Sequence, residues 1–448
     1  MKKIVFVFII LVMGSMSGMG QYVSETVDGS SIMPNSGKLI FVRDCPTTNY
    51  SLSFVAEDTS VYALWTYAFT SGSPYAIFQV KKIRMPLNIR MVTDMCAVDS
   101  IVFFCGYDTT GTCIIGYFDL LHLSLGPLPY TPHMVTTYQI TAVSSWDKIA
   151  VCKSNGNYHV YAIGEFYYNI GHVYKNTIVE IRNATAANSY NYVHLGSTLP
   201  YYSERIDDIV FTDNWIVFVG RDNYNHQPDR HLSMRKIGKN QDLYATDFNT
   251  LHYYTPQNEY NSSVCAIHTT RNIFIVAYAA LSATNPENYP VKIRAFNANN
   301  MNNTSSSKYY TYQKTNMYGL TYNSGADLLT ILHSKGLTTT FTIVTPPGAM
   351  FPYNYGYSDA TTDYSSVDIV STTQIIATSK KKWFLQDISP TVDHGCLVHS
   401  TYPVLDESNL THDSDVFQLG VSSFGITPVY SFPFSITTHV LNANCSQQ

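Results

Sequence analysis

Acidic side chains lie directly ahead of, or within, several apolar runs of the sequence, and they are the first candidates for chemistry. They are Asp94, Asp207, Asp208 and Asp368. Two carboxylates on a rigid framework can act as acid and base, or as acid and nucleophile, in glycoside hydrolysis when they stand roughly 5 to 9.5 Å apart. No spacing in the sequence ties any two of them together. We therefore assign no catalytic residue. A carbohydrate-active enzyme remains the alternative to a non-catalytic protein.

Metal-ligating side chains are densest in the last sixty residues. Residues 393–396, which include His394 and Cys396, lie close to His399 and to the segment 412–415. Imidazole, thiolate and carboxylate groups are ligands of zinc and copper. Two histidines five residues apart in an irregular segment have no enforced geometry, so we expect a polar loop here and assign no metal ion and no other cofactor. Serine-hydrolase and phosphate-binding motifs are absent from the sequence as well.

Tyrosines alternate in the segment 351–357, at Tyr353, Tyr355 and Tyr357, and proline and glycine accompany them. A tyrosine ring offers rigid, amphipathic contact area. These three residues are therefore candidate ligand-binding residues for a sugar or a protein partner. The alternative is a loop whose rings pack back onto the domain.

The eight cysteines permit disulfide bonds in an exported chain but do not require them, because the chain is long enough to build its own core. Cysteines inside apolar runs, such as Cys96 and Cys105, are expected to be buried thiols. Two pairings remain possible disulfides: Cys105 with Cys113 across a hairpin, and Cys396 with Cys445.

The elements that must position these residues follow a recurring pattern, in which a short apolar run, a polar turn and a second apolar run succeed one another. Seven copies begin at residues 52, 95, 140, 209, 264, 318 and 367. Most copies are followed by a further apolar strand, so that one unit has three or four antiparallel strands. Such recurrence is the signature of a β-propeller. The two runs of each copy are apolar at nearly every position, as expected for strands that neighbouring blades cover on both faces.

The sequence therefore predicts an all-β protein with a single β-propeller domain over residues 21–448, with seven blades, and eight as the alternative. Tandem β-sandwiches also contain many short strands, but no linker rich in proline, serine or glycine divides the chain. A predicted strand at 38–42 and predicted segments at 416–421 and 429–434 flank the repeats. We expect them to combine into one blade, so that N- and C-terminal strands close the ring.

Residues 1–20 have the features of a secretory signal peptide: Lys2 and Lys3, an apolar run over 4–13, and small residues up to Gly20. The apolar run is shorter than the roughly 20 residues that span a bilayer. We expect cleavage after Gly20, with an uncleaved anchor as the alternative. The mature chain is then expected in the periplasm, at the cell surface or outside the cell, without an integral membrane segment.

The charge balance argues against a nucleic-acid partner. The chain has 27 basic and 32 acidic residues, and the loss of Lys2 and Lys3 brings the mature chain to a net charge near −7. Proteins that bind nucleic acids usually carry a basic surface instead. The lysine run 380–382, beside Trp383, is interpreted as a set of solvated charges that keeps an edge strand from pairing with another chain. We expect a monomer.

Two segments resemble recurring signatures of secreted, generally uncharacterised proteins of the Bacteroidota. The segment 99–107, followed by 114–119, is similar to the pattern D-x-V-Y-F-C-G … G-I-I-G-x-F-D of that group, and 209–220 resembles a second segment. The resemblance implies export and a propeller-like fold, and it carries no functional residue over to this chain. The function that we predict is a non-catalytic binding module that engages a glycan or a protein through the propeller face. The alternative is a propeller glycoside hydrolase or lyase with channel-facing carboxylates.

Overall fold

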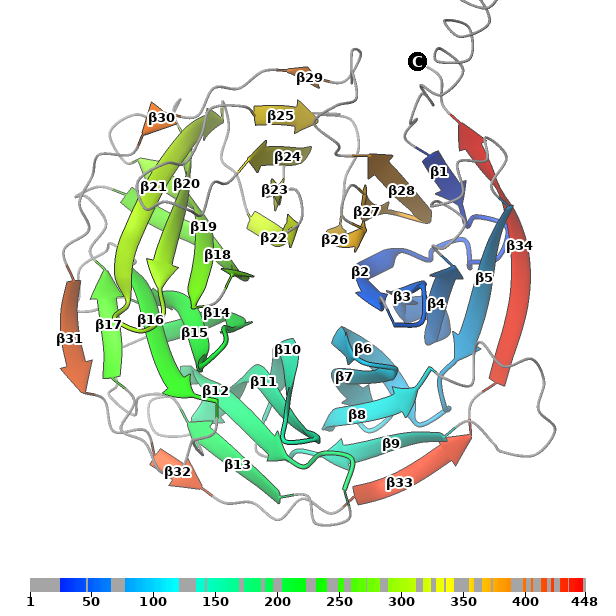
Figure 1. The fold of residues 1–448 in the computed structure, drawn as a ribbon. Coiled ribbons are helices and arrows are strands. Elements are labelled where there is room, and N and C mark those ends of the chain that lie inside the picture. Colours follow the sequence, from blue (N-terminus) through cyan, green and yellow to red (C-terminus); the bar gives the residue numbers. More distant parts are fainter. Residues whose placement is uncertain are drawn as a thin grey trace, which may run out of the picture.

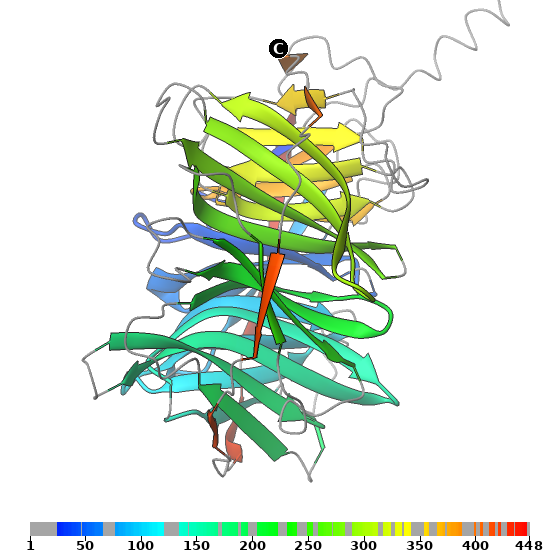
Figure 2. The same ribbon diagram turned by 90° about the vertical axis from the view of Figure 1, so that its left-hand side faces the viewer.

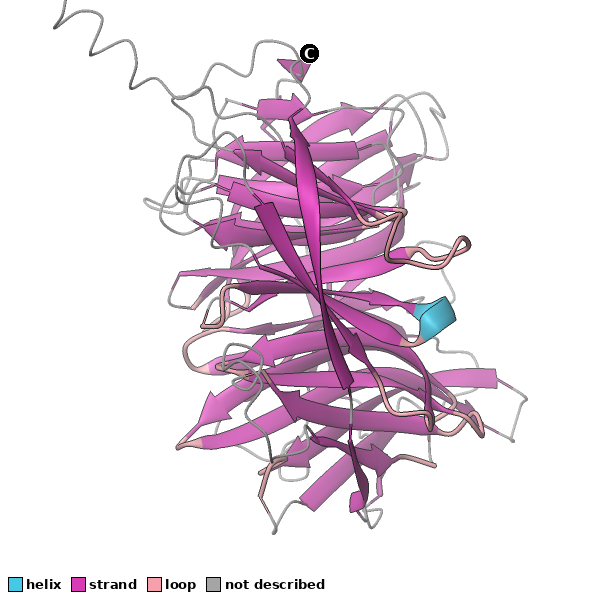
Figure 3. Ribbon diagram, turned by 90° about the vertical axis from the view of Figure 1, so that its right-hand side faces the viewer, coloured by secondary structure: helices cyan, strands magenta, loops and turns pink. Residues whose placement is uncertain are grey.

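The computed structural model describes residues 25–45, 47–65, 77–120, 134–141, 143–168, 173–186, 190–195, 204–222, 231–239, 249–253, 259–270, 272–282, 289–311, 317–323, 328–333, 336–341, 354–357, 365–371, 374–387, 398–399, 404–405, 412–416, 420–422, 428–433 and 435–445. Within these residues the only helical element is a 3-10 turn at Ala56–Asp58, which is cyan in Figure 3. None of the described residues forms a helix that is long and apolar enough to cross a membrane. The predicted signal peptide lies outside them.

The described strands form six antiparallel sheets that surround a common central axis as a ring, and the sheet of nine strands spans two of the seven units of the ring (Figure 1). We call each unit of four successive strands a blade and number the blades along the chain. Blade 1 contains β2 (Leu39–Cys45), β3 (Tyr50–Val55), β4 (Ser60–Trp65) and β5 (Ile77–Arg84). Blade 2 contains β6 (Ile89–Val98), β7 (Ile101–Asp108), β8 (Cys113–Asp119) and β9 (Met134–Gln139). Blade 3 contains β10 (Ser145–Ser154), β11 (Asn157–Tyr168), β12 (Val173–Arg182) and β13 (Tyr190–Leu195).

The remaining four blades repeat this arrangement, with the first strand of each blade nearest the axis. Blade 4 contains β14 (Glu204–Phe211), β15 (Trp215–Asp222), β16 (His231–Gly238) and β17 (Asn249–Tyr253). Blade 5 contains β18 (Glu259–Thr270), β19 (Ile273–Ser282), β20 (Tyr289–Asn297) and β21 (Asn302–Thr311). Blade 6 contains β22 (Met317–Asn323), β23 (Leu328–His333), β24 (Gly336–Phe341) and β25 (Asn354–Tyr357). Blade 7 contains β26 (Ser366–Ser371), β27 (Gln374–Ser379), β28 (Lys382–Asp387) and β1 (Glu25–Asp28). The predicted seven-bladed propeller is confirmed.

The ring closes through strands from both ends of the described chain. β1 pairs with β28 of blade 7 on one side and with β34 (Ser435–Cys445) on the other. β34 also pairs with β5, from Ser435 opposite Arg84 to Asn442 opposite Ile77, so it joins blades 7 and 1 into one continuous sheet. Closure by N- and C-terminal strands is therefore confirmed, but the segments are not the predicted ones. The predicted strand at 38–42 falls in β2, the innermost strand of blade 1.

The chain after blade 7 runs back around the outside of the ring and adds one outer strand to each of six blades. We call these the rim strands. They are β29 (Val398–His399) on blade 6, β30 (Val404–Leu405) on blade 5, β31 (His412–Val416) on blade 4, β32 (Gly420–Ser422) on blade 3, β33 (Pro428–Pro433) on blade 2, and β34 on blade 1. Figure 2 shows β31 lying across the outer edge of its blade. The expected single blade of C-terminal segments is wrong, because these segments extend separate blades and cover their outer edges.

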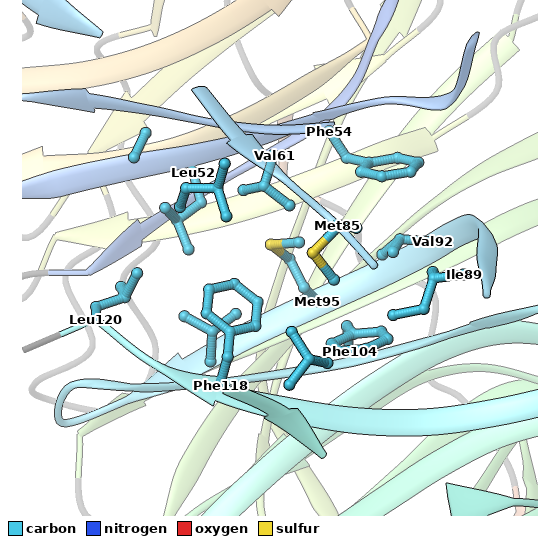
Figure 4. Packing of buried hydrophobic residues seen from close by; sticks show 14 of the residues in the cluster. Leu52, Phe54, Val61, Met85, Ile89, Val92, Met95, Phe104, Phe118 and Leu120 are labelled. Carbon is cyan, nitrogen blue, oxygen red and sulfur yellow. The ribbon is translucent and has the colours of Figure 1, made fainter. Parts of the chain in front are cut away.

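The core consists of layers between adjacent blades. Phe103 and Phe104 are neighbours on β7, yet Phe104 packs toward blade 1 with Leu52 and Phe54, whereas Phe103 packs toward blade 3 with Val160. Figure 4 shows the layer between blades 1 and 2. The second strands β3 and β7 thus bury both faces, which explains their nearly continuous apolar sequences. Burying one such phenylalanine contributes about 2–3 kcal/mol.

The predicted repeat matches the first two strands of blades 2, 4, 5, 6 and 7. In blade 1, the copy that begins at residue 52 falls on the second and third strands, because the first strand, β2, carries Arg43 and Asp44 and was not recognised as part of the unit. In blade 3, only the second run of the copy, Ile149 to Cys152, lies in a strand of the blade, namely β10.

Candidate functional site

The inner strands of blades 2, 3 and 4 share a β-bulge at the same level. The register of the first strand against the second shifts between Val92 and Asp94, between Trp146 and Lys148, and between Ile206 and Asp208. The extra residues are Thr93, Asp147 and Asp207. A bulge re-aims the side chains around it, and here the extra residue is a threonine or an aspartate in each strand.

A glycine on the second strand faces each of these bulges. A Cβ atom on Gly106 would lie 2.0 Å from the carbonyl oxygen of Met91, and a Cβ atom on Gly220 would lie 1.9 Å from that of Arg205. Gly164 has the same relationship to Ser145, at 2.2 Å. The two strands approach too closely there for any side chain, so the glycine and the bulge form one repeated unit.

Asp94 follows the bulge of blade 2 and is bonded to the blades on both sides. Its Oδ1 atom accepts a hydrogen bond of 2.7 Å from Nη2 of Arg43 in blade 1, and its Oδ2 atom accepts one of 3.1 Å from the backbone N–H of Ile149 in blade 3. Asp94 is only 4% exposed. Arg43 also donates to Ser366 of blade 7, at 3.3 Å. Burial disfavours the charged form of Arg43, but the carboxylates of Asp94 and Asp368 together raise its pKa.

Asp208 repeats this arrangement two blades further on. Its Oδ1 atom lies 2.5 Å from Nζ of Lys148 in blade 3, and its Oδ2 atom accepts a hydrogen bond of 2.9 Å from the backbone N–H of Ala266 in blade 5. It is 3% exposed. Asp94 and Asp208 thus each bind a cation of the preceding blade and an N–H group of the following one. We call this arrangement a carboxylate bridge.

Asp368 connects blade 7 to blade 1. Its Oδ2 atom accepts a hydrogen bond of 2.9 Å from the backbone N–H of Asp44, and Ser51 donates to Oδ1 of Asp44, also at 2.9 Å. Asp44 is therefore a second carboxylate close to Asp368. Burial, followed by the negative charge of Asp368, raises the pKa of Asp44 to about 7.

Asp207 lies between two arginines at the interface of blades 3 and 4. Arg221 donates to both of its oxygens, at 2.8 and 3.1 Å, and Nε of Arg205 lies 3.2 Å from Oδ1. Arg205 also extends toward Asp147, at 3.7 Å. Burial raises the pKa of Asp207, and the two arginines offset only part of that effect. Burial raises the pKa of Asp147 as well.

All four carboxylates that the sequence singled out lie on innermost strands, and each binds a neighbouring group. Asp94, Asp208 and Asp368 join adjacent blades, and Asp207 forms a bidentate salt bridge with Arg221. The sequence reasoning missed the cations Arg43, Lys148, Arg205 and Arg221. Each of these cations lies inside or beside an apolar run of the sequence. An unpaired charge would be costly there, so such a position indicates a buried ion pair.

The tyrosine segment lies far from the inner strands. Tyr355 and Tyr357 belong to β25, the fourth strand of blade 6, and pair there with Thr339 and Leu337. Tyr353 lies outside the described residues. Part of the expected loop is therefore a strand on the outer side of its blade, between β24 and the rim strand β29.

The cysteines of blade 2 are free thiols. Cys105 lies opposite Ile115 and Cys113 lies opposite Tyr107, so the two are not cross-strand partners, and both are buried and unbridged. Burial raises the pKa of both, that of Cys113 to about 12, which makes them poor nucleophiles. Cys396 lies outside the described residues, so its pairing with Cys445 stays a prediction.

The histidines near the C-terminus are distributed over different blades. His399 lies on β29 of blade 6, whereas His412 lies on β31 of blade 4. The segment 393–396 is outside the described residues. Among the described residues, no group of three or more histidine, cysteine, aspartate or glutamate side chains is arranged to hold a metal ion.

Comparisons with known proteins return structures alone. No family model matches the sequence, and no curated protein matches it. The β-propeller domain of Myceliophteria thermophila Cps50 (Swd1) has a TM-score of 0.49 at 9% identity, over 82% of this chain and 100% of that one. Kuenenia stuttgartiensis hydrazine synthase has the same score and identity, over 82% and 99%. Extracellular domains 1–2 of Drosophila Semaphorin 1a reach 0.47 at 6% identity, over 82% and 88%. At these values the propeller assignment rests on the strand pairing of the chain itself.

Proposed function

We propose that this chain is an exported, non-catalytic binding module that engages a glycan or a protein through a face of the propeller. The observation that carries the proposal is the carboxylate bridge. Asp94 and Asp208 are almost fully buried, and each already binds a cation on one side and a backbone N–H group on the other. A carboxylate held in this way is not available to move a proton to or from a substrate.

The charges of the inner strands are thus explained by the assembly of the ring. Adjacent blades contact each other mainly through apolar layers, which resist separation but do not fix one blade in register with the next. Hydrogen bonds from a carboxylate to both neighbours supply that directional constraint. A rigid ring of this kind presents its turns as fixed surfaces, which suits ligand binding.

The alternative is a propeller carbohydrate-active enzyme, and one observation favours it. Asp44 has a pKa raised to about 7 and lies beside a second carboxylate, Asp368. A carboxylic acid that keeps its proton near neutral pH is what a general acid requires. Raised pKa values also occur in structural clusters, and Asp368 is engaged with the backbone of blade 1. We therefore rank the binding module first.

One experiment separates the two functions. The full chain is screened on a glycan array, and the same polysaccharides are incubated with it in a hydrolysis and lyase assay. We expect binding without turnover. The Asp44→Asn and Asp368→Asn variants serve as the check on catalysis, and Asp207→Asn and Asp208→Asn test the other two carboxylates. Turnover by the wild-type chain that any of these substitutions abolishes, in a variant that remains folded, would overturn the proposal.

A further inference from the structure

A depression of about 580 Å³ lies between blade 7 and the segment that links it to blade 1. Four lysines line it: Lys38 from the linking segment, and Lys380, Lys381 and Lys382 from the turn between β27 and β28. The expectation that the run 380–382 protects an edge strand is wrong, because β28 lies between β27 and β1 and is not an edge. The lysines instead gather around one hollow of a chain whose net charge is −5.

The lysine turn is fixed in place by the linking segment. The backbone N–H of Gly29 donates to the carbonyl of Lys381 at 2.9 Å, and that of Leu39 donates to the carbonyl of Lys380 at 2.6 Å. Both carbonyl oxygens of the turn are thus occupied. Beneath the turn, Trp383 is completely buried and its indole N–H donates to Ser53 of blade 1, at 3.0 Å. The lysine turn is therefore held in place by its neighbours, which lowers the entropic cost of binding a ligand.

The conformation of Lys380 is a second indication. Its φ angle is +51°, in the left-handed region. Two-residue hairpin turns place glycine, asparagine or aspartate there, because a longer side chain is disfavoured. A lysine at this position costs local stability, and such local strain is typical of functional positions.

Among the described residues, one carboxylate lies close to the lysines of the turn. Asp28 lies 3.9 Å from Lys382, and about half of the Lys382 side chain and two-fifths of that of Asp28 are exposed. Such a pair is weak in water. Burial alone would raise the pKa of Asp28, but hydrogen bonds from Ser30 and the charges of Lys382 and Lys381 lower it overall, so Asp28 stays ionised. Among the described residues, this weak pair leaves the three ammonium groups of the turn, on Lys380, Lys381 and Lys382, with a net positive charge.

The other lining groups favour a sugar as the carrier of the anion. Ser30, Ser36 and Asn35 line the depression and offer hydroxyl and amide groups to hydroxyl-rich ligands, and Phe384 adds an apolar ring. The volume lies within the range of small-ligand sites. A long nucleic acid would extend beyond the depression onto a chain of net negative charge, which opposes its binding.

We infer that the depression lined by Lys38, Lys380, Lys381 and Lys382 binds the carboxylate or sulfate groups of an acidic oligosaccharide. This inference rests on the proposed binding function and names its ligand class. An ammonium group is a compact charge that binds either group through short, charge-assisted hydrogen bonds.

The test is isothermal titration calorimetry of the full chain at 50 mM NaCl. The probes are a heparin-derived octasaccharide, an oligogalacturonate of eight residues and a neutral cello-oligosaccharide. We expect one or both acidic probes to bind and the neutral probe not to bind. Comparison of the two acidic probes identifies the source of the charge as sulfate or uronate.

The variant is Lys380→Asn/Lys381→Gln, which removes two charges while placing asparagine at the left-handed position of the turn. We expect the dissociation constant for the acidic probe to rise about tenfold or more. The control is Lys153→Ala, which removes an exposed lysine from the end of β10, beside the turn between β10 and β11. That turn lies at the opposite ends of the strands, so the dissociation constant should stay within about twofold of the wild type. Binding by the wild-type chain should also weaken about tenfold between 50 and 500 mM NaCl, which tests the inference without a variant.

The outcomes separate the inference from the proposed function. Absence of acidic-probe binding, unchanged affinity in a folded double variant, or tighter binding of a single-stranded DNA 20-mer or of anionic phospholipid vesicles would overturn the inference. The proposed function would still stand if neutral glycans or a protein bound elsewhere on the chain. Turnover of an oligosaccharide would overturn the proposed function instead.

Discussion

Arg43 of blade 1 donates to Asp94 of blade 2 at 2.7 Å, and the other oxygen of the same carboxylate binds the backbone of blade 3. One side chain thus holds three consecutive blades in register. Asp208 does the same for blades 3, 4 and 5. If these carboxylates join the blades, changes to them and to the strands around them should have the effects described below.

Replacing Asp94 by asparagine should destabilise the ring. The amide presents an NH₂ group to either Arg43 or the N–H of Ile149, so one of the two bonds is lost and a donor faces a donor. We expect the free energy of unfolding to fall by about 1–3 kcal/mol, as for other buried hydrogen bonds to charged groups. Urea unfolding followed by fluorescence measures it. The matched control is Glu57→Gln, which makes the same change from carboxylate to amide at an exposed residue of the 3-10 turn and should hardly affect stability. Equal effects of the two substitutions would contradict the bridge.

The glycine opposite the bulge predicts a sharp contrast between two substitutions. Gly106→Ala brings a methyl group to 2.0 Å from a backbone carbonyl oxygen, whereas the nearest atom to a Cβ atom on Gly319 is 3.8 Å away. Gly106→Ala should cost about 2 kcal/mol or more, because the strands must move apart. Gly319→Ala should remain within about 1 kcal/mol of the wild type. Thermal unfolding of the two variants side by side decides the point, and a tolerated Gly106→Ala would show that the two strands are not in close contact.

The raised pKa of Asp44 predicts a dependence of stability on pH. In the unfolded chain the group titrates near 3.8, and in the folded chain near about 7. The folded state therefore binds more protons between these values, so stability falls as pH rises from about 4 to 7 and then levels off. Asp44→Asn removes this contribution. The variant should be more stable than the wild type at pH 8, by at most about 4 kcal/mol at 1.36 kcal/mol per pKa unit, and the difference should vanish near pH 4. Denaturant midpoints across this range measure it. A difference that does not change with pH would refute the shift.

Removal of the last rim strand, β34, should disrupt the closure of the ring. Deleting residues 435–448 removes β34, which pairs with β5 along eight residues and with β1 along three. The continuous sheet would then be broken between β1 and β5, and both strands would expose open edges. We expect loss of the cooperative thermal transition, or self-association in size-exclusion chromatography. Deletion of residues 446–448 leaves β34 intact and serves as the control. A monomeric, cooperatively folding truncation would mean that β34 does not close the ring.

The sequence predicted the features that depend on local pattern, and the rest depended on contacts between distant strands. Seven hairpins were recognisable because their strands are apolar on both faces, as Phe103 and Phe104 show. The rim strands were not placed on their blades, since segments as short as Val398–His399 and Val404–Leu405 carry no periodicity. The candidate aspartates were found, but their role was not. The partner of Asp94 lies 51 residues away at Arg43, and no sequence spacing reveals that pair.

The most direct test of the central claim is a double-mutant cycle between Lys148 and Asp208, which belong to blades 3 and 4 and lie 2.5 Å apart. The free energy of unfolding is measured for the wild type, Lys148→Met, Asp208→Asn and the double variant. If the carboxylate holds the blades together, the cycle yields a coupling energy of about 1–2 kcal/mol, as for residues in direct contact. A coupling energy indistinguishable from zero would contradict the claim that inner-strand carboxylates serve to join the blades.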